Sequence, residues 1–151
     1  MIRKSSRADI TAIMEIVADA QALLRSRGVD QWQDGYPTAD IIAQDIARAE
    51  SYVIEIDRSV AATAVISFAG EVTYNSIDGA WLNDNSYVVV HRLAVRNSAL
   101  RSGLARQMML YAEELALQSG IEDIRVDTHS DNVAMQALLA RLDYKLCGKI
   151  T

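Results

Sequence analysis

The chain has 151 residues and a net charge of −5, and half of its residues are hydrophobic. This length suits one domain with a sizeable core, over residues 1–151, and the composition excludes a disordered tail, a collagen-like repeat and a low-complexity linker. The single cysteine, Cys147, excludes an internal disulfide framework and a cysteine-rich zinc site, and we interpret it as a small apolar strand residue.

The first half of the chain predicts a strand, two helices and a hairpin. Residues 2–4 are expected to form a short strand, and residues 6–9 have capping-box spacing before a helix that ends at Gly28. Thr38 is placed to cap a second helix that ends near residue 50. The apolar period then changes to two, which predicts two strands joined by a tight turn: 52–56 and 60–68.

The second half alternates strands with helices. Residues 70–85 are rich in Gly, Asn, Asp and Ser and are expected to form a long loop. Residues 87–95 are apolar almost throughout, which predicts a central strand that is buried on both faces. The pattern then predicts a helix, a strand, a helix and a last strand: 104–119, 123–128, 132–142 and 144–150. We therefore expect a mixed α/β fold with helices on both faces of one sheet.

The distribution of charge and hydropathy limits the classes of binding partner that we expect. Residues 1–90 carry 7 basic and 13 acidic residues, so no basic stripe dominates and nucleic acid is not expected as a partner. Acidic residues interrupt the first apolar stretch, so we expect no signal peptide, no membrane partner and a cytoplasmic location. Residues 86–112 lack acids and favour a small anion through four arginines: Arg92, Arg96, Arg101 and Arg106.

The connection between the central strand and the next helix is suited to a diphosphate. A helix N-terminus offers backbone N–H groups without internal partners, and the helix dipole adds partial positive charge. Gly103 allows a ligand to approach the backbone, and Ala105 keeps the next turn thin. The alternative is an ordinary strand-to-helix connection with solvated arginines.

The sequence resembles the GNAT superfamily of acetyl-CoA-dependent N-acetyltransferases over nearly its whole length. The resemblance is carried by His91 to Val95, by the loop that ends at Gly103 to Ala105, and by Asp127 to Asn132 with Leu142 to Tyr144. It implies that acetyl-CoA lies between strands 87–95 and 123–128. The implied cofactor contacts are the backbones of Leu93 and Val95, the amides of Arg101, Ser102, Gly103, Leu104 and Ala105, and the side chain of Asn132.

The resemblance also implies direct attack of an amine on the thioester, without a covalent enzyme intermediate. The amine must lose a proton, so a base or a water chain is needed. His91 in the central strand is our candidate base, and the alternative is a buried, neutral, structural histidine. No carboxylates flank the two histidines at ligand spacing, so we expect no metal.

The sequence departs from the family pattern at three points. The loop has Leu100 and Arg101 where relatives usually carry Gln or Arg and then a Gly. Leu139 stands where many relatives have a tyrosine that acts as general acid. Asp143 replaces a Gly, and Asp tolerates a left-handed helix end at some cost.

Relatives usually carry a seventh strand between the fifth and the sixth, and we expect this chain to lack it. Either the sixth strand then moves over, or a homodimer partner covers the open edge, because an exposed strand edge invites pairing. Trp32 and Tyr36, with nearby carboxylates, are candidate acceptor-binding residues, and the alternative is packing of a long loop. Glu71, Tyr74 and Trp81 allow the same two interpretations.

We therefore expect an N-acetyltransferase that moves the acetyl group of acetyl-CoA to a primary amine of a small molecule or peptide. Two alternatives stay open. One is a CoA-binding module with little or no turnover, either a remnant or a regulatory subunit. The other is a structural dimer domain that binds no cofactor. A ligand that binds the native state must raise its stability, so thermal stabilisation by CoA separates the last alternative from the others.

Overall fold

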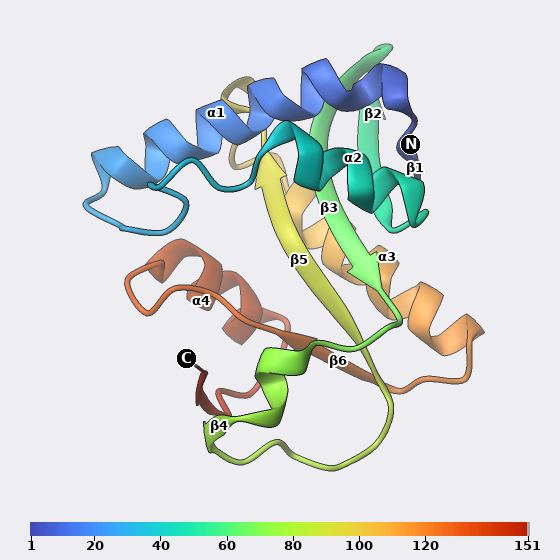
Figure 1. Ribbon diagram of the computed structural model, residues 1–151, viewed down its shortest axis with the longest axis vertical. Helices are drawn as coiled ribbons and strands as arrows, with labels where there is room; N and C mark the ends of the chain where they lie inside the picture. The colour runs from blue at the N-terminus through green and yellow to red at the C-terminus, as the bar shows by residue number, and fades with distance from the viewer. Residues whose placement is uncertain (151) are drawn as a thin grey trace.

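The computed structural model describes residues 1–150, in which one five-stranded sheet lies between two layers of helices (Figure 1). The strands follow the order β1-β2-β3-β5-β6, and only β5 and β6 are parallel to each other. Their bounds are β1 Ile2–Lys4, β2 Ser51–Ile56, β3 Ser59–Ser67, β5 Tyr87–Val95 and β6 Asp123–Val126. The predicted fold class, mixed α/β and mainly antiparallel with helices on both faces, is confirmed.

The two helical layers bury different apolar clusters. On one face, α1 (Ile10–Ser26) and α2 (Ala39–Ala47) pack on β2 through Ile13, Ile42 and Val53. On the other face, α3 (Leu104–Gln118) and α4 (Val133–Arg141) cover a larger cluster. Its members come from three strands and both helices: Ile54, Ala62, Val88, Val90, Met108, Met109 and Leu138.

Strand β5 is the centre of the molecule, as its composition predicts. Val88, Val89 and Val90 are all buried, although consecutive side chains point to opposite faces of a strand. β5 therefore has helices over both faces, and the polar side chains of His91 and Arg92 in its second half are only partly exposed.

Residues 70–85 correct the sequence prediction. They contain a short 3₁₀ helix, Val72–Asn75, and the strand β4, Ile77–Gly79, where we expected only a loop. β4 pairs with the terminal strand β7, Gly148–Ile150, in a separate antiparallel sheet. The chain thus has seven strands among residues 1–150, so the expected count of six is wrong. The additional strand is β4, and no described strand lies between β5 and β6, which pair directly.

The two-stranded sheet depends on two facing glycines. A Cβ at Gly79 would clash with the Cys147 carbonyl oxygen, and a Cβ at Gly148 would clash with the Asp78 carbonyl oxygen. Both glycines have positive φ. Such short, polar, glycine-containing segments carry no alternating apolar pattern, which explains why the sequence did not predict the pairing.

The terminal strand does not move over to β6. It pairs with β4, and β6 remains the edge of the five-stranded sheet in the part of the chain that the structure describes. In the same part of the chain, no helix has both the length and the apolar character needed to cross a membrane.

An ion pair between Arg3 and Asp9 joins the N-terminal strand to the segment before α1. Arg3 donates from Nη1 and Nη2 to the Asp9 carboxylate at 2.8 and 3.0 Å, and the Ser6 N–H donates to it at 2.7 Å. These hydrogen bonds, led by that from Arg3, lower the pKa of Asp9 to about 2. A lowered carboxyl pKa stabilises the fold at neutral pH and is lost in acid.

We predict that Asp9→Asn lowers the free energy of unfolding by about 2 kcal/mol at pH 7. The difference from wild type should shrink as the pH falls from about 5 towards 2, because the wild-type carboxyl is then protonated. Urea unfolding at several pH values measures this. Asp84→Asn in the exposed loop before β5 is the control, and an unchanging difference between pH 7 and pH 3 would contradict the prediction.

Candidate functional site

Strands β5 and β6 separate halfway along β5. Their parallel register joins Tyr87 to Asp123 and ends with Val90 opposite Val126. On the other side, β5 continues to pair with β3 as far as Val95. The second half of β5 therefore has one edge that β6 does not occupy, and a ligand with an extended backbone can pair there.

A β-bulge marks the point of separation. His91 pairs with Val65 and Ala94 pairs with Thr63, so Arg92 and Leu93 together face the single residue Ala64 of β3. Arg92 has a φ of 51°, in the left-handed region. An extra residue of this kind bends its strand and redirects the neighbouring side chains. Sequence analysis did not predict the bulge.

His91 lies next to the bulge, between two carboxylates. Its Nε2 is 3.6 Å from Glu71 Oε1, and its Nδ1 is 4.0 Å from Asp127 Oδ1. Burial lowers the pKa of His91 below the usual 6.5, and the Arg92 charge lowers it further, while Asp127, Glu71 and Asp45 raise it. The net shift is downward, so the imidazole is neutral at pH 7 and can accept a proton.

The 3₁₀ helix that precedes β4 completes this cluster. Glu71 caps it by accepting from the Thr73 N–H at 3.1 Å, and Tyr74 within it is 1% exposed. The Tyr74 hydroxyl donates to Asp127 Oδ1. Burial, with the Asp127 contact, raises the pKa of Tyr74, so this phenol stays protonated. Tyr74 therefore orients Asp127 beside His91.

Trp81 belongs to the packing around Tyr74. Its Nε1 donates to the Tyr74 carbonyl at 2.9 Å, and the two ring centroids are 5.1 Å apart. The Arg125 guanidinium of β6 lies 4.4 Å from the Trp81 ring centroid and 4.0 Å from that of Tyr87. These contacts hold the loop before β5 against β6.

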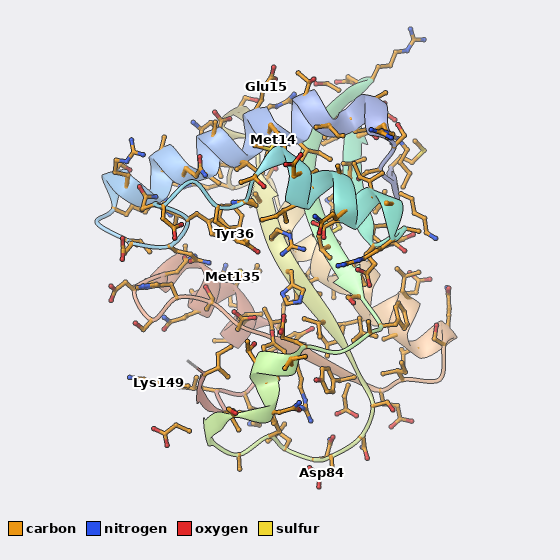
Figure 2. The ribbon with its side chains drawn as sticks, viewed as in Figure 1. Met14, Glu15, Tyr36, Asp84, Met135 and Lys149 are labelled. Atoms are coloured by element: carbon orange, nitrogen blue, oxygen red, sulfur yellow. The ribbon has the colours of Figure 1, made fainter. Side chains whose placement is uncertain are left out.

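Arg92 is tied to α2 and not directed at a ligand. Its Nε and Nη2 donate to the two oxygens of Asp45 at 2.9 and 2.6 Å, and Asp45 is 2% exposed. Its Nη1 donates to the Tyr36 hydroxyl at 2.6 Å. Tyr36, labelled in Figure 2, lies in the loop that leads into α2. The structure thus brings Tyr36 next to the strand that carries His91.

Two of the four arginines within residues 86–112, where we expected a small anion to bind, are exposed. Arg92 is paired with Asp45, and Arg96 donates to Ser59 Oγ at 2.6 Å and to the Val60 carbonyl at 3.3 Å. Arg101 and Arg106 are exposed, and Arg101 has a positive φ. Arg92 is therefore not free for the anion expected in residues 86–112, because its guanidinium is paired with Asp45.

The loop before α3 leaves room for a ligand. Gly103 is the N-cap of α3 with a φ of 83°, and a Cβ built there meets no atom within 4 Å. Gln107 is the first residue of α3 to donate back into this loop, to the Gly103 carbonyl at 3.0 Å. The amides before it, including those of Arg101, Ser102, Leu104 and Ala105, lie at a helix start, where N–H groups lack intrahelical partners.

The open edge of β5 presents the backbone of Val95. The Arg96 N–H donates to the Ala61 carbonyl on β3 at 2.9 Å. Neighbouring N–H groups of a strand point to opposite edges, so the Val95 N–H points away from β3, to the side that β6 has left. Leu93 lies two residues earlier, and both side chains pack against the main core cluster.

Asn132 caps α4 and joins it to the loop between α1 and α2. Its Oδ1 accepts from the Met135 N–H at 3.1 Å, and its Nδ2 donates to Gln31 Oε1 at 3.0 Å. Trp32 follows Gln31 and has a φ of 63°. The two predicted acceptor-site residues therefore have different surroundings: Tyr36 contacts Arg92 of β5, and Trp32 follows Gln31, which contacts the residue that caps α4.

The departures around α4 are visible in the structure. Leu139 packs on the main core cluster and provides no acid. Asp143 has a φ of 66°, so it takes the left-handed position at the helix end as expected. Leu139 and Asp143 both line a groove of about 1430 Å³, which runs along β6 and reaches Asp127 and His129.

Sequence reasoning missed Asp45 and the structural use of Arg92. The sequence does contain a pattern that indicates this ion pair. Asp45 lies three residues after the buried Ile42 on α2, and Arg92 interrupts an apolar strand. Two opposite charges on faces that are expected to be buried favour an ion pair, because isolated charges are costly there.

The comparisons identify the family. The model of the Acetyltransferase (GNAT) family matches residues 14–144. The chain belongs to the GNAT family of acetyltransferases. A solved GNAT-family acetyltransferase from Streptococcus agalactiae is 35% identical, with a TM-score of 0.89, over 99% of this chain and 87% of that one.

Two further relatives are more limited matches. GCN5-related N-acetyltransferase 6, chloroplastic, from Arabidopsis thaliana is 36% identical over 62 residues, which are 41% of this chain and only 22% of that protein. A predicted acetyltransferase from Clostridium acetobutylicum, solved with acetyl-CoA, is 14% identical with a TM-score of 0.63, over 97% of this GNAT chain and 90% of that one. At that identity it shows the fold alone.

The site gives a prediction for the ionisation of His91. We expect its pKa to lie below 6.5, because burial disfavours the charged imidazole. The chain has two histidines, so a His129→Gln variant leaves a single imidazole to follow by NMR during a pH titration. A midpoint above 6.5 would show that the two carboxylates outweigh burial and would contradict the neutral base.

Proposed function

We propose that this GNAT chain transfers the acetyl group of acetyl-CoA to a primary amine by direct attack in a ternary complex. The observation that carries the proposal is the separation of β5 from β6 beside a partly buried histidine. An open edge of β5 lies on one side of His91 and would take acetyl-CoA. Two carboxylates lie beside His91 and would attract the amine.

The proposed cofactor contacts follow the open edge. The backbones of Leu93 and Val95 would pair with the pantetheine arm, and the amides from Arg101 to Ala105 would hold the diphosphate at the start of α3. Gly103 supports this, because nothing fills the space beside it. Asn132, which is already fixed by Gln31, would lie near the thioester.

The proposed chemistry assigns one proton acceptor. The incoming ammonium gives a proton to neutral His91, and the free amine attacks the thioester carbonyl carbon. The C–N bond forms, the C–S bond breaks, and the second nitrogen proton leaves with the sulfur of coenzyme A. Positioning of the two substrates supplies much of the rate, and the base adds typically 10²–10⁴-fold.

We propose that the acceptor is a cationic primary amine of a small molecule or peptide. Glu71 and Asp127 flank His91 at 3.6 and 4.0 Å and would attract the ammonium before it is deprotonated. The ring of Tyr36, beside Arg92, would form part of the wall, and Trp32 would contribute from the same loop. The homodimer and the cytoplasmic location stay predictions.

Cofactor binding is tested with the glycine at the start of α3. Gly103→Glu should abolish micromolar binding of acetyl-CoA in calorimetric titration, because it adds a side chain and a negative charge where the diphosphate is proposed. Gly120→Glu is the matched control, since Gly120 also has a positive φ with nothing within 4 Å and lies after the opposite end of α3. Equal affinity in both variants would reject the placement.

Turnover is tested with the base. With acetyl-CoA and a panel of spermidine, lysine amide and phenethylamine, wild type should release coenzyme A only when an amine is present. His91→Gln should lower kcat/KM by about 100-fold at pH 7 and recover part of it at alkaline pH, where free amine forms without a base. Binding of acetyl-CoA without any amine-dependent release by wild type would instead favour a binding module.

A further inference from the structure

The bulge in β5 is held by a side chain that is unusual for its backbone. Arg92 adopts the left-handed conformation, which is unfavourable for a residue with a long side chain, and glycine would adopt it without strain. A residue stays in such a conformation only where surrounding contacts over-determine it. The contacts of the Arg92 side chain therefore hold the backbone in this conformation.

Those contacts come from α2 and from the loop before it. Asp45 receives two hydrogen bonds from the guanidinium, at 2.9 and 2.6 Å, and its side chain is 3% exposed. Tyr36 receives a third at 2.6 Å. A fork of two parallel hydrogen bonds fixes both the position and the direction of the guanidinium.

We propose that Arg92, held by Asp45, is a positioning residue that fixes the bulge in β5 and thereby directs the His91 side chain into the acetyl-transfer site. The functional consequence rests on the proposed acetyl transfer. Neither Arg92 nor Asp45 touches a substrate in this proposal, because the two side chains are hydrogen-bonded to each other and Arg92 also donates to Tyr36.

The charges around His91 supply a readout that stability alone would not move. Arg92 is the one cation among the groups that shift the pKa of His91, and it lowers that pKa. Three carboxylates raise it: Asp127 just after β6, Glu71 in the loop after β3, and Asp45 on α2. The two members of the ion pair therefore act on His91 in opposite directions.

The first experiment is an NMR titration of His91 in a His129→Gln background. Arg92→Met should raise the midpoint, because a nearby positive charge is removed, and Asp45→Asn should lower it, because a negative charge is removed while the shape is kept. A merely loosened structure would expose the imidazole and raise the midpoint in both variants. Shifts of the same sign, or no shift in either variant, would overturn the proposal.

The second experiment separates positioning from stability. The double variant Asp45→Leu/Arg92→Met replaces a buried ion pair by apolar side chains, an exchange that often leaves stability unchanged or improved. We expect it to remain folded, with a thermal midpoint close to that of wild type, yet to lose at least tenfold in kcat with acetyl-CoA and the best amine of the panel. Wild-type kcat in the folded double variant would overturn the proposal.

Asp9→Asn is the control for both experiments, since it breaks another Arg–Asp pair far along the sheet, between β1 and the start of α1. It should lower stability without changing the His91 midpoint or kcat.

Arg92→Lys keeps the positive charge but cannot form the two parallel hydrogen bonds to Asp45. It should leave the His91 midpoint close to the wild-type value and still lower kcat. If wild type shows no acetyl transfer, the proposed function fails, while the NMR titration still decides whether the pair positions His91.

Discussion

Strands β5 and β6 pair over four residues and then separate, and the rest of the site depends on that separation. The bulge at Arg92 lies one residue beyond His91, so an irregularity at the point of separation also sets where the histidine points. The separated strands leave the backbone of Leu93 and Val95 available, and the helix that follows β5 begins at a glycine with open space beside it. One short stretch of the strand thus carries both the proposed cofactor edge and the proposed base.

The energies involved explain why a buried ion pair is suited to this position. A left-handed backbone at a non-glycine residue costs on the order of 1–2 kcal/mol, and the bulge also forgoes regular pairing. Removing one partner of a buried pair costs roughly 3–5 kcal/mol, because the other charge is left without compensation. The Asp45 contact is therefore large enough to hold Arg92 in an unfavourable conformation. An Arg92→Gly substitution would relieve the strain, but it would not connect β5 to α2.

Much of the fold follows from local patterns in the sequence. The continuous apolar run of β5 predicts a central strand, and Thr38 and Gly103 mark helix starts that the structure confirms. The pairing of β4 with β7 could not be predicted, because each strand has three residues and the contact joins positions about seventy residues apart. At the site, His91 was a candidate base from its position alone. Its surroundings could not be predicted, because Glu71, Asp127 and Arg92 meet only through the tertiary fold.

Amide hydrogen exchange at two neighbouring residues tests the central claim most directly. The Arg96 N–H is bonded to β3, whereas the Val95 N–H points to the edge that β6 has left. The account predicts that Val95 exchanges faster than Arg96 in the free protein and becomes protected when acetyl-CoA is added, with little change at Arg96. Strong protection of Val95 in the free protein, or binding of acetyl-CoA without protection of Val95, would contradict it.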